Sequence, residues 1–416
     1  MHKHENIYER LLNYADNMKI IDTHEHLNPH KNYPGDEPDV LGDYLSQYIS
    51  TDLMSAGMKE AELNTVKDYK LDLIKRYKIL ELYLEQVKNT SYYRALEIAA
   101  ERIHGIKEIS GKTIEELNEK YKNAANREDY GRYVMKDLCN IEAAINDNWS
   151  NDMKWSKTDL FFPAWQPDAY VTPDINLPVF NSVNLTLDEY CENYKQFFLK
   201  QKNDGMKVLK LATAYWRSIY FEDVDYGTAS DLFLQFKKNG DSPAFPKKLQ
   251  DYMMHFILKT ADENNLAVQI HTGLQEGMGY DLEDSNPMLL KKLFNKYPNI
   301  VFDIFHTGYP YERELMVLAK THANVYVDFC WSHIVSPFAA KNSFYEMLDV
   351  LPYSKIFGFG GDYTVYDGVA GHIIMAKQNI CTVLAKKVRK NECDYNLAEK
   401  ILQSVLYDNA KRVFEL

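Results

Sequence analysis

Residues 18–26 read Met-Lys-Ile-Ile-Asp-Thr-His-Glu-His, a short apolar run that leads directly into a cluster of polar side chains. The apolar run, residues 18–21, has the length and composition of a buried strand. In extended backbone, side chains two residues apart point to the same side, so His24 and His26 can present both imidazoles to one ion immediately after this strand. A single His-x-His pair also occurs by chance, because unpaired histidines are often ordinary core or surface residues.

Seven further apolar runs follow, separated by helical or irregular segments, in the rhythm of parallel strands joined by crossover helices. They cover residues 139–145, 159–163, 206–213, 266–271, 300–306, 325–329 and 355–360. The first two of these seven can also be interpreted as loops. With residues 18–21 the runs number eight, which predicts an α/β fold, a distorted (β/α)8 barrel, with residues 1–416 forming a single domain.

A long helical stretch interrupts this rhythm directly after the first strand. Between residues 39 and 132 the sequence is charged, with apolar residues at i, i+3 and i+4, so we expect an all-helical insertion there. Residues 5–17 and 397–414 are also expected to be helical. Because the loops that follow barrel strands build the catalytic face, the insertion is expected to roof the pocket.

Charge and composition exclude several classes of partner. The formal net charge is −12 and the pI is near 5.5, which disfavours nucleic acid because phosphate binding needs a concentrated basic face. No stretch approaches the roughly 20 apolar residues of a membrane-spanning helix, and the amino terminus lacks a signal-peptide core. The five cysteines show no C-x-x-C spacing, so we expect reduced thiols and a cytoplasmic protein that binds no membrane.

Three more of the expected strands end in a residue that can bind a metal. His271 ends LAVQIH, His306 ends IVFDIFH, and Asp362 follows KIFGFGG. In a barrel all carboxyl ends of the strands converge on one mouth, so these residues would join His24 and His26 there. The predicted ligands are His24, His26, His271 and Asp362. The alternative is that each polar residue only marks a strand that ends in solvent.

This ligand set predicts one or two divalent ions. Imidazole and carboxylate suit Zn, Mn, Fe or Ni, and zinc is chosen on abundance alone. A bound ion lowers the pKa of its water toward about 7, and Asp362 can then act both as ligand and as proton acceptor. His306 either ligates a second metal or stays unmetallated and polarises the substrate carbonyl.

Other residues near the expected strand ends are candidates for substrate binding. Lys210 is expected to be carboxylated and bridge two metals, to bind substrate as a cation, or to reach solvent along its flexible stem. Arg217 can bind a substrate carboxylate through its guanidinium, or pair with Glu222 or Asp223. Trp331 and His333, after the seventh strand, are expected to line the pocket.

The motifs together resemble a known family. They are DTHEHL, VLKLATAYWRS, VQIHTG, FHTGYPYERE, ANVYVDF and FGGDY. They resemble the amidohydrolase-related (amidohydrolase 2) family of the amidohydrolase superfamily, and residues 206–414 look most like the amidohydrolase domain that is sometimes fused to glutamine synthetase-like domains. The resemblance also covers residues 20–26, but it is poor across the insertion, and we expect no synthetase-like domain within residues 1–416.

This resemblance implies a distorted (β/α)8 barrel with one or two divalent metals. By position the matches are His24 and His26 on the first strand, Lys210 on the fourth, His271 on the fifth, His306 on the sixth and Asp362 on the eighth. It implies hydrolysis of a C–N bond in a small polar substrate that can bear a carboxylate. A decarboxylase, a uronate-isomerase-like enzyme and a non-catalytic binding barrel are the alternatives. The 31 tyrosines and the insertion also suggest a homo-oligomer contact, although half-buried tyrosines explain them equally well.

Overall fold

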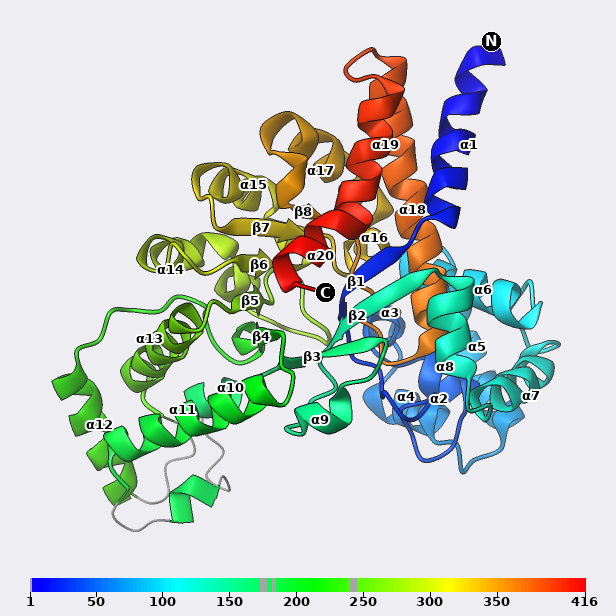
Figure 1. Ribbon diagram of the computed structural model, residues 1–416. Helices are drawn as coiled ribbons and strands as arrows, with labels where there is room; N and C mark the ends of the chain where they lie inside the picture. Colours follow the sequence, from blue (N-terminus) through cyan, green and yellow to red (C-terminus); the bar gives the residue numbers. More distant parts are fainter. Residues whose placement is uncertain (1, 173–177, 182–184, 240–244) are drawn as a thin grey trace.

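The computed structural model describes residues 2–172, 178–181, 185–239 and 245–416, and its centre is one sheet of eight parallel strands in sequential order (Figure 1). The strands are β1 Ile20–Glu25, β2 Ile141–Asn146, β3 Phe161–Trp165, β4 Val208–Leu211, β5 Ala267–Ile270, β6 Phe302–Ile304, β7 Val325–Asp328 and β8 Ile356–Phe357. Backbone hydrogen bonds from Thr23 N to Phe359 O (3.1 Å) and from Asp362 N to His24 O (2.8 Å) join β1 to the segment after β8. The sheet therefore curls into a nearly closed (β/α)8 barrel.

The predicted strands are confirmed, including the two that could have been loops. The expectation that the His-x-His motif follows the first strand is wrong in detail, because β1 runs to Glu25 and contains His24. The backbone beyond Ile21 keeps pairing with β2, with Asp22 opposite Ala144 and Glu25 opposite Asn146. These polar residues extend the strand because their backbone groups find partners in the sheet.

Helices cover the outside of the barrel. α1 His2–Asn17 precedes β1. The helices after β2 are of two kinds, long crossover helices and short helices of three to six residues. Those after β2 are α9 Met153–Ser156, α10 Asp168–Val171, η2 Pro178–Asn181, α11 Leu187–Asn203, η3 Thr213–Tyr215, α12 Tyr226–Asn239, α13 Lys247–Glu263, η4 Leu282–Ser285, η5 Pro287–Leu290, α14 Lys291–Lys296, η6 Phe305–Gly308, α15 Glu312–Thr321, α16 Ser332–Val335, α17 Pro337–Val350, η7 Tyr353–Lys355, α18 Tyr366–Arg389, α19 Tyr395–Gln403, η8 Ser404–Asp408 and α20 Asn409–Phe414. Within the described ranges, none of these helices combines the length and the apolar character that crossing a bilayer requires.

The connection from β1 to β2 is almost entirely helical. It contains α2 Val40–Tyr44, α3 Tyr48–Ser55, α4 Glu60–Lys67, α5 Leu73–Val87, α6 Ser91–His104, α7 Ile114–Ala125, α8 Tyr130–Arg132 and the π-helix η1 Tyr133–Leu138. In Figure 1 these blue and cyan helices gather beside α18.

Buried polar contacts attach this helical region to α18, which follows β8. Asp367 near the start of α18 accepts hydrogen bonds from Tyr44 Oη (2.6 Å), from His104 Nε2 (2.7 Å) and from Tyr130 Oη. Further along, a Cβ on Gly371 would lie 2.0 Å from the carbonyl oxygen of Ala95 in α6, so only glycine permits this approach of the two helices.

The end of the barrel opposite the polar strand ends is apolar. Val208 and Ala267, the first residues of β4 and β5, belong to a buried cluster with Phe357 of β8 and Ala410 and Phe414 of α20. The carboxy-terminal helix thus closes the amino-terminal end of the strands and leaves the other end free for the site.

Candidate metal centre

Three of the predicted ligands meet at the carboxyl end of the barrel. His26 Nε2 lies 3.3 Å and His24 Nε2 lies 3.9 Å from Asp362 Oδ1. The two imidazoles stand edge to face, with ring centroids 4.8 Å apart. Separations of this size are those between neighbouring ligands of one ion, because each metal–ligand bond is about 2.0–2.2 Å long.

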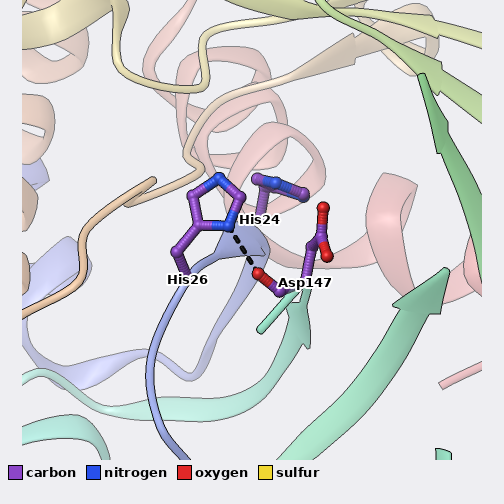
Figure 2. Close-up of side chains that lie close together, drawn as sticks. All are labelled: His24, His26 and Asp147. Atoms are coloured by element: carbon purple, nitrogen blue, oxygen red, sulfur yellow. Dashed lines mark hydrogen bonds between the residues drawn. The ribbon is translucent and has the colours of Figure 1, made fainter. Parts of the chain in front are cut away.

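In each of these two rings, Nδ1 contacts an oxygen that can accept a hydrogen bond but cannot donate one. His24 Nδ1 lies 3.0 Å from Gln269 Oε1, and His26 Nδ1 donates to the backbone carbonyl of Asp147, the dashed line in Figure 2. The Gln269 oxygen faces His24 because the amide nitrogen donates to Thr23 O (2.9 Å) and Asp303 Oδ2 (3.0 Å). Both histidines therefore carry their proton on Nδ1 and direct the Nε2 lone pair into the cluster, where a metal can bind.

His271 and His306 form a second pair of donors. His306 Nε2 lies 3.0 Å from His271 Nδ1. The other nitrogens donate to carbonyls, from His306 Nδ1 to Cys330 O (2.9 Å) and from His271 Nε2 to Leu274 O (3.2 Å). The facing nitrogens are then two lone pairs, an arrangement that suits a shared cation.

Asp362 lies between the two pairs. Its Oδ2 is 3.9 Å from His306 Nε2, while Oδ1 faces His24 and His26. Both Asp362 (φ 59°) and His306 (φ 62°) adopt left-handed backbone, which is uncommon for residues other than glycine. Such strain persists where the surrounding structure fixes the residue, as at functional sites.

Burial and neighbouring charges set the protonation of the cluster. Burial lowers the pKa of His24 and His271 well below the usual range and that of His306 to about 4, so these rings are neutral near pH 7. Burial alone would raise the pKa of Asp362, but the hydrogen bond and charge of His26, with the charge of His306, hold it below its ordinary value. Burial alone would lower the pKa of His26, but its hydrogen bond to Asp362 and the charge of that carboxylate raise it. Three neutral imidazoles and an ionised carboxylate are the protonation states that metal ligation needs.

The structure adds two possible ligands that the sequence analysis missed. The Asp147 carboxylate, after β2, lies within 4.8 Å of ligand atoms of His24 and His26, and Cys330 is similarly grouped with His306 and Asp362. The side chains of His24, His26 and Asp147 converge in Figure 2. Asp147 ends a strand as the other candidates do, and this position was the signal that could have identified it.

Asp22 and Glu25 position Asp362, a role that sequence reasoning also missed. Asp22 Oδ1 accepts a hydrogen bond from Gly361 N (3.0 Å), and Glu25 Oε2 accepts one from Tyr363 N (2.8 Å). Side chains of β1 thus hold the backbone on both sides of Asp362. A Cβ on Gly361 would lie 1.7 Å from Glu25 Oε1, so the close approach requires glycine. The signal for this role was a pair of acidic residues within a buried strand.

Lys210 points into the cluster and does not reach solvent. It is 3% exposed, its Nζ lies 3.3 Å from His24 Nε2, and the ammonium sits 4.0 Å from the centroid of the Phe305 ring. Both a carboxylated Lys210 and a cationic one that binds substrate are compatible with this position.

The other predicted substrate-binding residues contact protein groups and not the cavity beside the candidate ligands. Arg217 donates to Asp251 Oδ1 (2.7 Å), Gln250 Oε1 (3.0 Å) and a backbone carbonyl, so its guanidinium is already paired, although with a different acid from those considered in the sequence analysis. Trp331 is buried against Tyr48 and Tyr92, and His333 donates to Gly358 O (2.9 Å). None of the three lines the cavity at the metal ligands.

The cavity beside the candidate ligands has a volume of about 240 Å³, and both polar and aromatic side chains line it. Its walls are His26, Gln47, Tyr48, Trp149, Gln166, Lys210, Ala212, Tyr215, Trp216, His271, Glu276, Asp362 and Thr364. Gln47 and Tyr48 come from the helical region after β1, which therefore forms part of the wall, as expected. The size suits a small polar molecule, and the metal ligands lie at one side of it.

Known proteins resemble this chain in part of the sequence and in the whole fold. The amidohydrolase family profile matches residues 236–416. The protein fluG of Emericella nidulans is 28% identical over 185 residues, which are 41% of this chain but only 20% of fluG, so the chain spans about a fifth of the length of that relative.

Among solved structures, the uronate isomerase of Thermotoga maritima superposes with a TM-score of 0.77 at 18% identity, covering 98% of this chain and 97% of that one. The glucuronate isomerase of Caulobacter crescentus gives 0.76 at 17% identity, with 100% and 95% coverage. A Lactobacillus casei protein described as a metal-dependent hydrolase gives 0.68 at 16% identity, with 97% coverage of both chains. At these identities the likeness shows the shared fold.

The sequence match and the barrel geometry agree with the resemblance found in the motifs. The profile match includes His271, His306 and Asp362, and β1 adds His24 and His26 to the same cluster. Residues 236–416 therefore match the amidohydrolase family, and they form part of a complete set of eight parallel barrel strands.

Proposed function

We propose that the chain hydrolyses an amide-type C–N bond in a small polar substrate. The observation that carries this proposal is Asp362, whose two oxygens face two separate pairs of imidazoles. A divalent ion held by these donors would polarise a substrate carbonyl and increase the acidity of a water molecule. The nitrogen and oxygen donors suit Zn, Mn, Fe or Ni, and zinc is our first choice.

The chain's own residues then handle protons and orient the substrate. Asp362 is ionised near neutral pH, so it can accept a proton from the attacking water and return it to the departing nitrogen. Lys210, in the cationic form, can hold an anionic substrate group. Tyr215 also lines the cavity, with its ring centroid 4.6 Å from that of His271. Gln166 and Thr364 also line the cavity and carry groups that can form hydrogen bonds.

The test is turnover of a panel of N-acetyl and N-formyl amino acids and simple carboxamides by metal-supplied full-length chain, with released amine as the readout. Asp362→Asn is the variant that tests the role of this carboxylate, because it keeps the shape of the side chain and removes its charge. The proposal holds if at least one amide releases amine and the variant loses that turnover. Amine release that survives in Asp362→Asn would contradict the assigned role of this carboxylate.

A second candidate is aldose–ketose isomerisation of a sugar acid. It is favoured by the likeness to uronate isomerases over nearly the whole chain and by the many amide and hydroxyl groups that line the cavity. Incubation with glucuronate, followed by NMR, would reveal a rearranged isomer with no release of amine. Release of CO2 from an aromatic or sugar acid would instead identify a decarboxylase.

A further inference from the structure

A second, larger cavity adjoins the cavity of about 240 Å³ beside the candidate ligands, which we call the metal cavity. Its volume is about 660 Å³, and it shares three lining residues with the smaller one, Trp149, Gln166 and Trp216. The rest of its lining is Asp147, Ser150, Asn151, Trp165, Asp168, Ala169, Tyr170, Thr172, Val179, Asn193 and Phe197. A molecule too long for the metal cavity can therefore extend past the shared residues into this space.

Trp149 stands at the junction in an unusual conformation. It is 61% exposed, its backbone is left-handed (φ 57°), and its indole stacks on His26 with ring centroids 4.4 Å apart and planes 9° from parallel. The backbone N–H of Trp149 donates to Asp147 Oδ1 (3.2 Å), which fixes this turn. A bulky residue with positive φ is a strained choice, and exposure of so large an aromatic ring gains nothing for folding.

A second tryptophan is exposed at the same junction. Trp216 is 46% exposed, and Trp165 and Phe197, which pack against each other with centroids 5.4 Å apart, form the floor of the larger cavity. Aromatic faces with a free side are the usual partners of planar or apolar ring groups, which gain from both stacking and burial.

The charge of the lining selects among ring-bearing ligands. Asp147 and Asp168 are the charged side chains there, and no Lys, Arg or His lies among the described residues that line the larger cavity. Asp168 is satisfied by Thr213 Oγ1 (2.6 Å) and Ala212 N (3.1 Å), whereas Asp147 Oδ2 is buried and has no hydrogen-bond partner within the described ranges. The surroundings thus suit a neutral or cationic group and repel an anion.

We propose that the larger cavity binds the ring-bearing half of the substrate, a planar, uncharged or cationic group, while the group to be cleaved lies in the metal cavity. The assignment of the cleaved group rests on the proposed amide hydrolysis, but the ring site itself does not. The substrate class is an amide with a ring, and no negative charge, in the part that enters the larger cavity.

Binding to metal-supplied full-length chain tests the proposal, with calorimetry or ligand-observed NMR as the measurement. The probes are N-methylacetamide, N-benzylacetamide, and N-benzylacetamide with either an aminomethyl or a carboxylate group in the para position. We expect N-benzylacetamide to bind at least about tenfold more tightly than N-methylacetamide, because the ring loses apolar surface to the tryptophans. The para-carboxylate is expected to bind more weakly than the neutral and the cationic ligands.

Variants connect this binding to the assigned cavity. Trp216→Ala should weaken N-benzylacetamide by about fivefold to tenfold, and Trp216→Phe should restore most of the affinity. Trp155→Ala is the matched control, because Trp155 is 41% exposed but lines neither cavity. Equal affinity for the ringed and ringless amides, or an equal loss in Trp216→Ala and Trp155→Ala, would overturn the proposal.

The same ligands separate this inference from the proposed function. Ring-dependent binding without hydrolysis of any amide would leave the ring site in place and remove the hydrolase assignment. Hydrolysis of small aliphatic amides without ring-dependent binding would leave the hydrolase assignment in place and remove the ring site.

Discussion

His271 Nδ1 and His306 Nε2 face each other at 3.0 Å, and each ring donates its proton to a backbone carbonyl on the other side. Two lone pairs at this distance repel unless a cation lies between them or beside them. The same separation is typical of two imidazole ligands of one ion, given metal–nitrogen bonds of about 2.0–2.1 Å. We propose that this pair and the His24–His26 pair are two halves of one metal centre.

Each pair of histidines is expected to be necessary for full metal loading. In the His271→Ala/His306→Ala variant, metal bound per chain should fall by at least half, and the His24→Ala/His26→Ala variant should lose at least as much. Plasma mass spectrometry on protein without an affinity tag measures both. His30→Ala/His322→Ala removes two histidines outside the cluster and should keep the wild-type content. Unchanged content in the His271/His306 variant would assign this pair a role other than ligation.

Gln269 is expected to act through His24, as a positioning residue. Its oxygen accepts from His24 Nδ1 at 3.0 Å, and both residues are fully buried. Gln269→Leu removes this acceptor and should weaken metal affinity by about 10- to 100-fold, as loss of such supporting contacts does elsewhere. Competition with a chelator measures the affinity. Gln201→Leu removes another buried glutamine and should leave it unchanged; a similar loss in both variants would indicate general destabilisation instead.

Stability is expected to fall as the pH drops below about 6.5. Burial lowers the pKa of His333 from 6.5 to about 4, so the unfolded chain takes up a proton at a pH where the folded chain does not. This contribution is fully present above pH 6.5 and is lost as the pH falls toward 4, a loss on the order of 3 kcal/mol.

Thermal unfolding of wild type and His333→Gln between pH 7 and pH 4 measures this effect. The variant should show a shallower decline than the wild type, because one proton fewer is taken up on unfolding. His30→Gln, a change at the surface, should follow the wild-type curve. Parallel curves for wild type and His333→Gln would show that His333 takes no part in the acid sensitivity.

Arg76 is expected to be essential for the helical region after β1. It is 2% exposed, and it donates from Nη1 and Nη2 to the two oxygens of Asp39, each at 2.7 Å. Arg76→Met leaves Asp39 as a buried and unpaired charge, which should cost about 3–5 kcal/mol. Chemical denaturation measures the loss. Arg94→Met on the exposed side of α6 should change stability by no more than about 0.5 kcal/mol, and a comparable effect of both changes would argue against the buried ion pair.

The sequence by itself determined the barrel and predicted which residues lie together at the carboxyl ends of its strands. Apolar runs set the eight strands, because strand formation follows local side-chain preference and the burial of short segments. The positions of His24, His271, His306 and Asp362 near strand ends could also be predicted from the neighbouring residues in the sequence. Their meeting then followed from one rule of the fold, that parallel strands in a barrel all end at the same mouth.

Only the tertiary structure decided what each side chain contacts. Arg217 pairs with Asp251 rather than facing the substrate cavity, and Gln269 orients a histidine that is 245 positions away in the chain. Such contacts depend on rotamers and on neighbours from other strands, which periodicity does not encode. The larger cavity likewise exists because Trp149 and Trp216, from separate loops, come to the same place. Local preference sets the strands and their ends, whereas packing in three dimensions sets the partners.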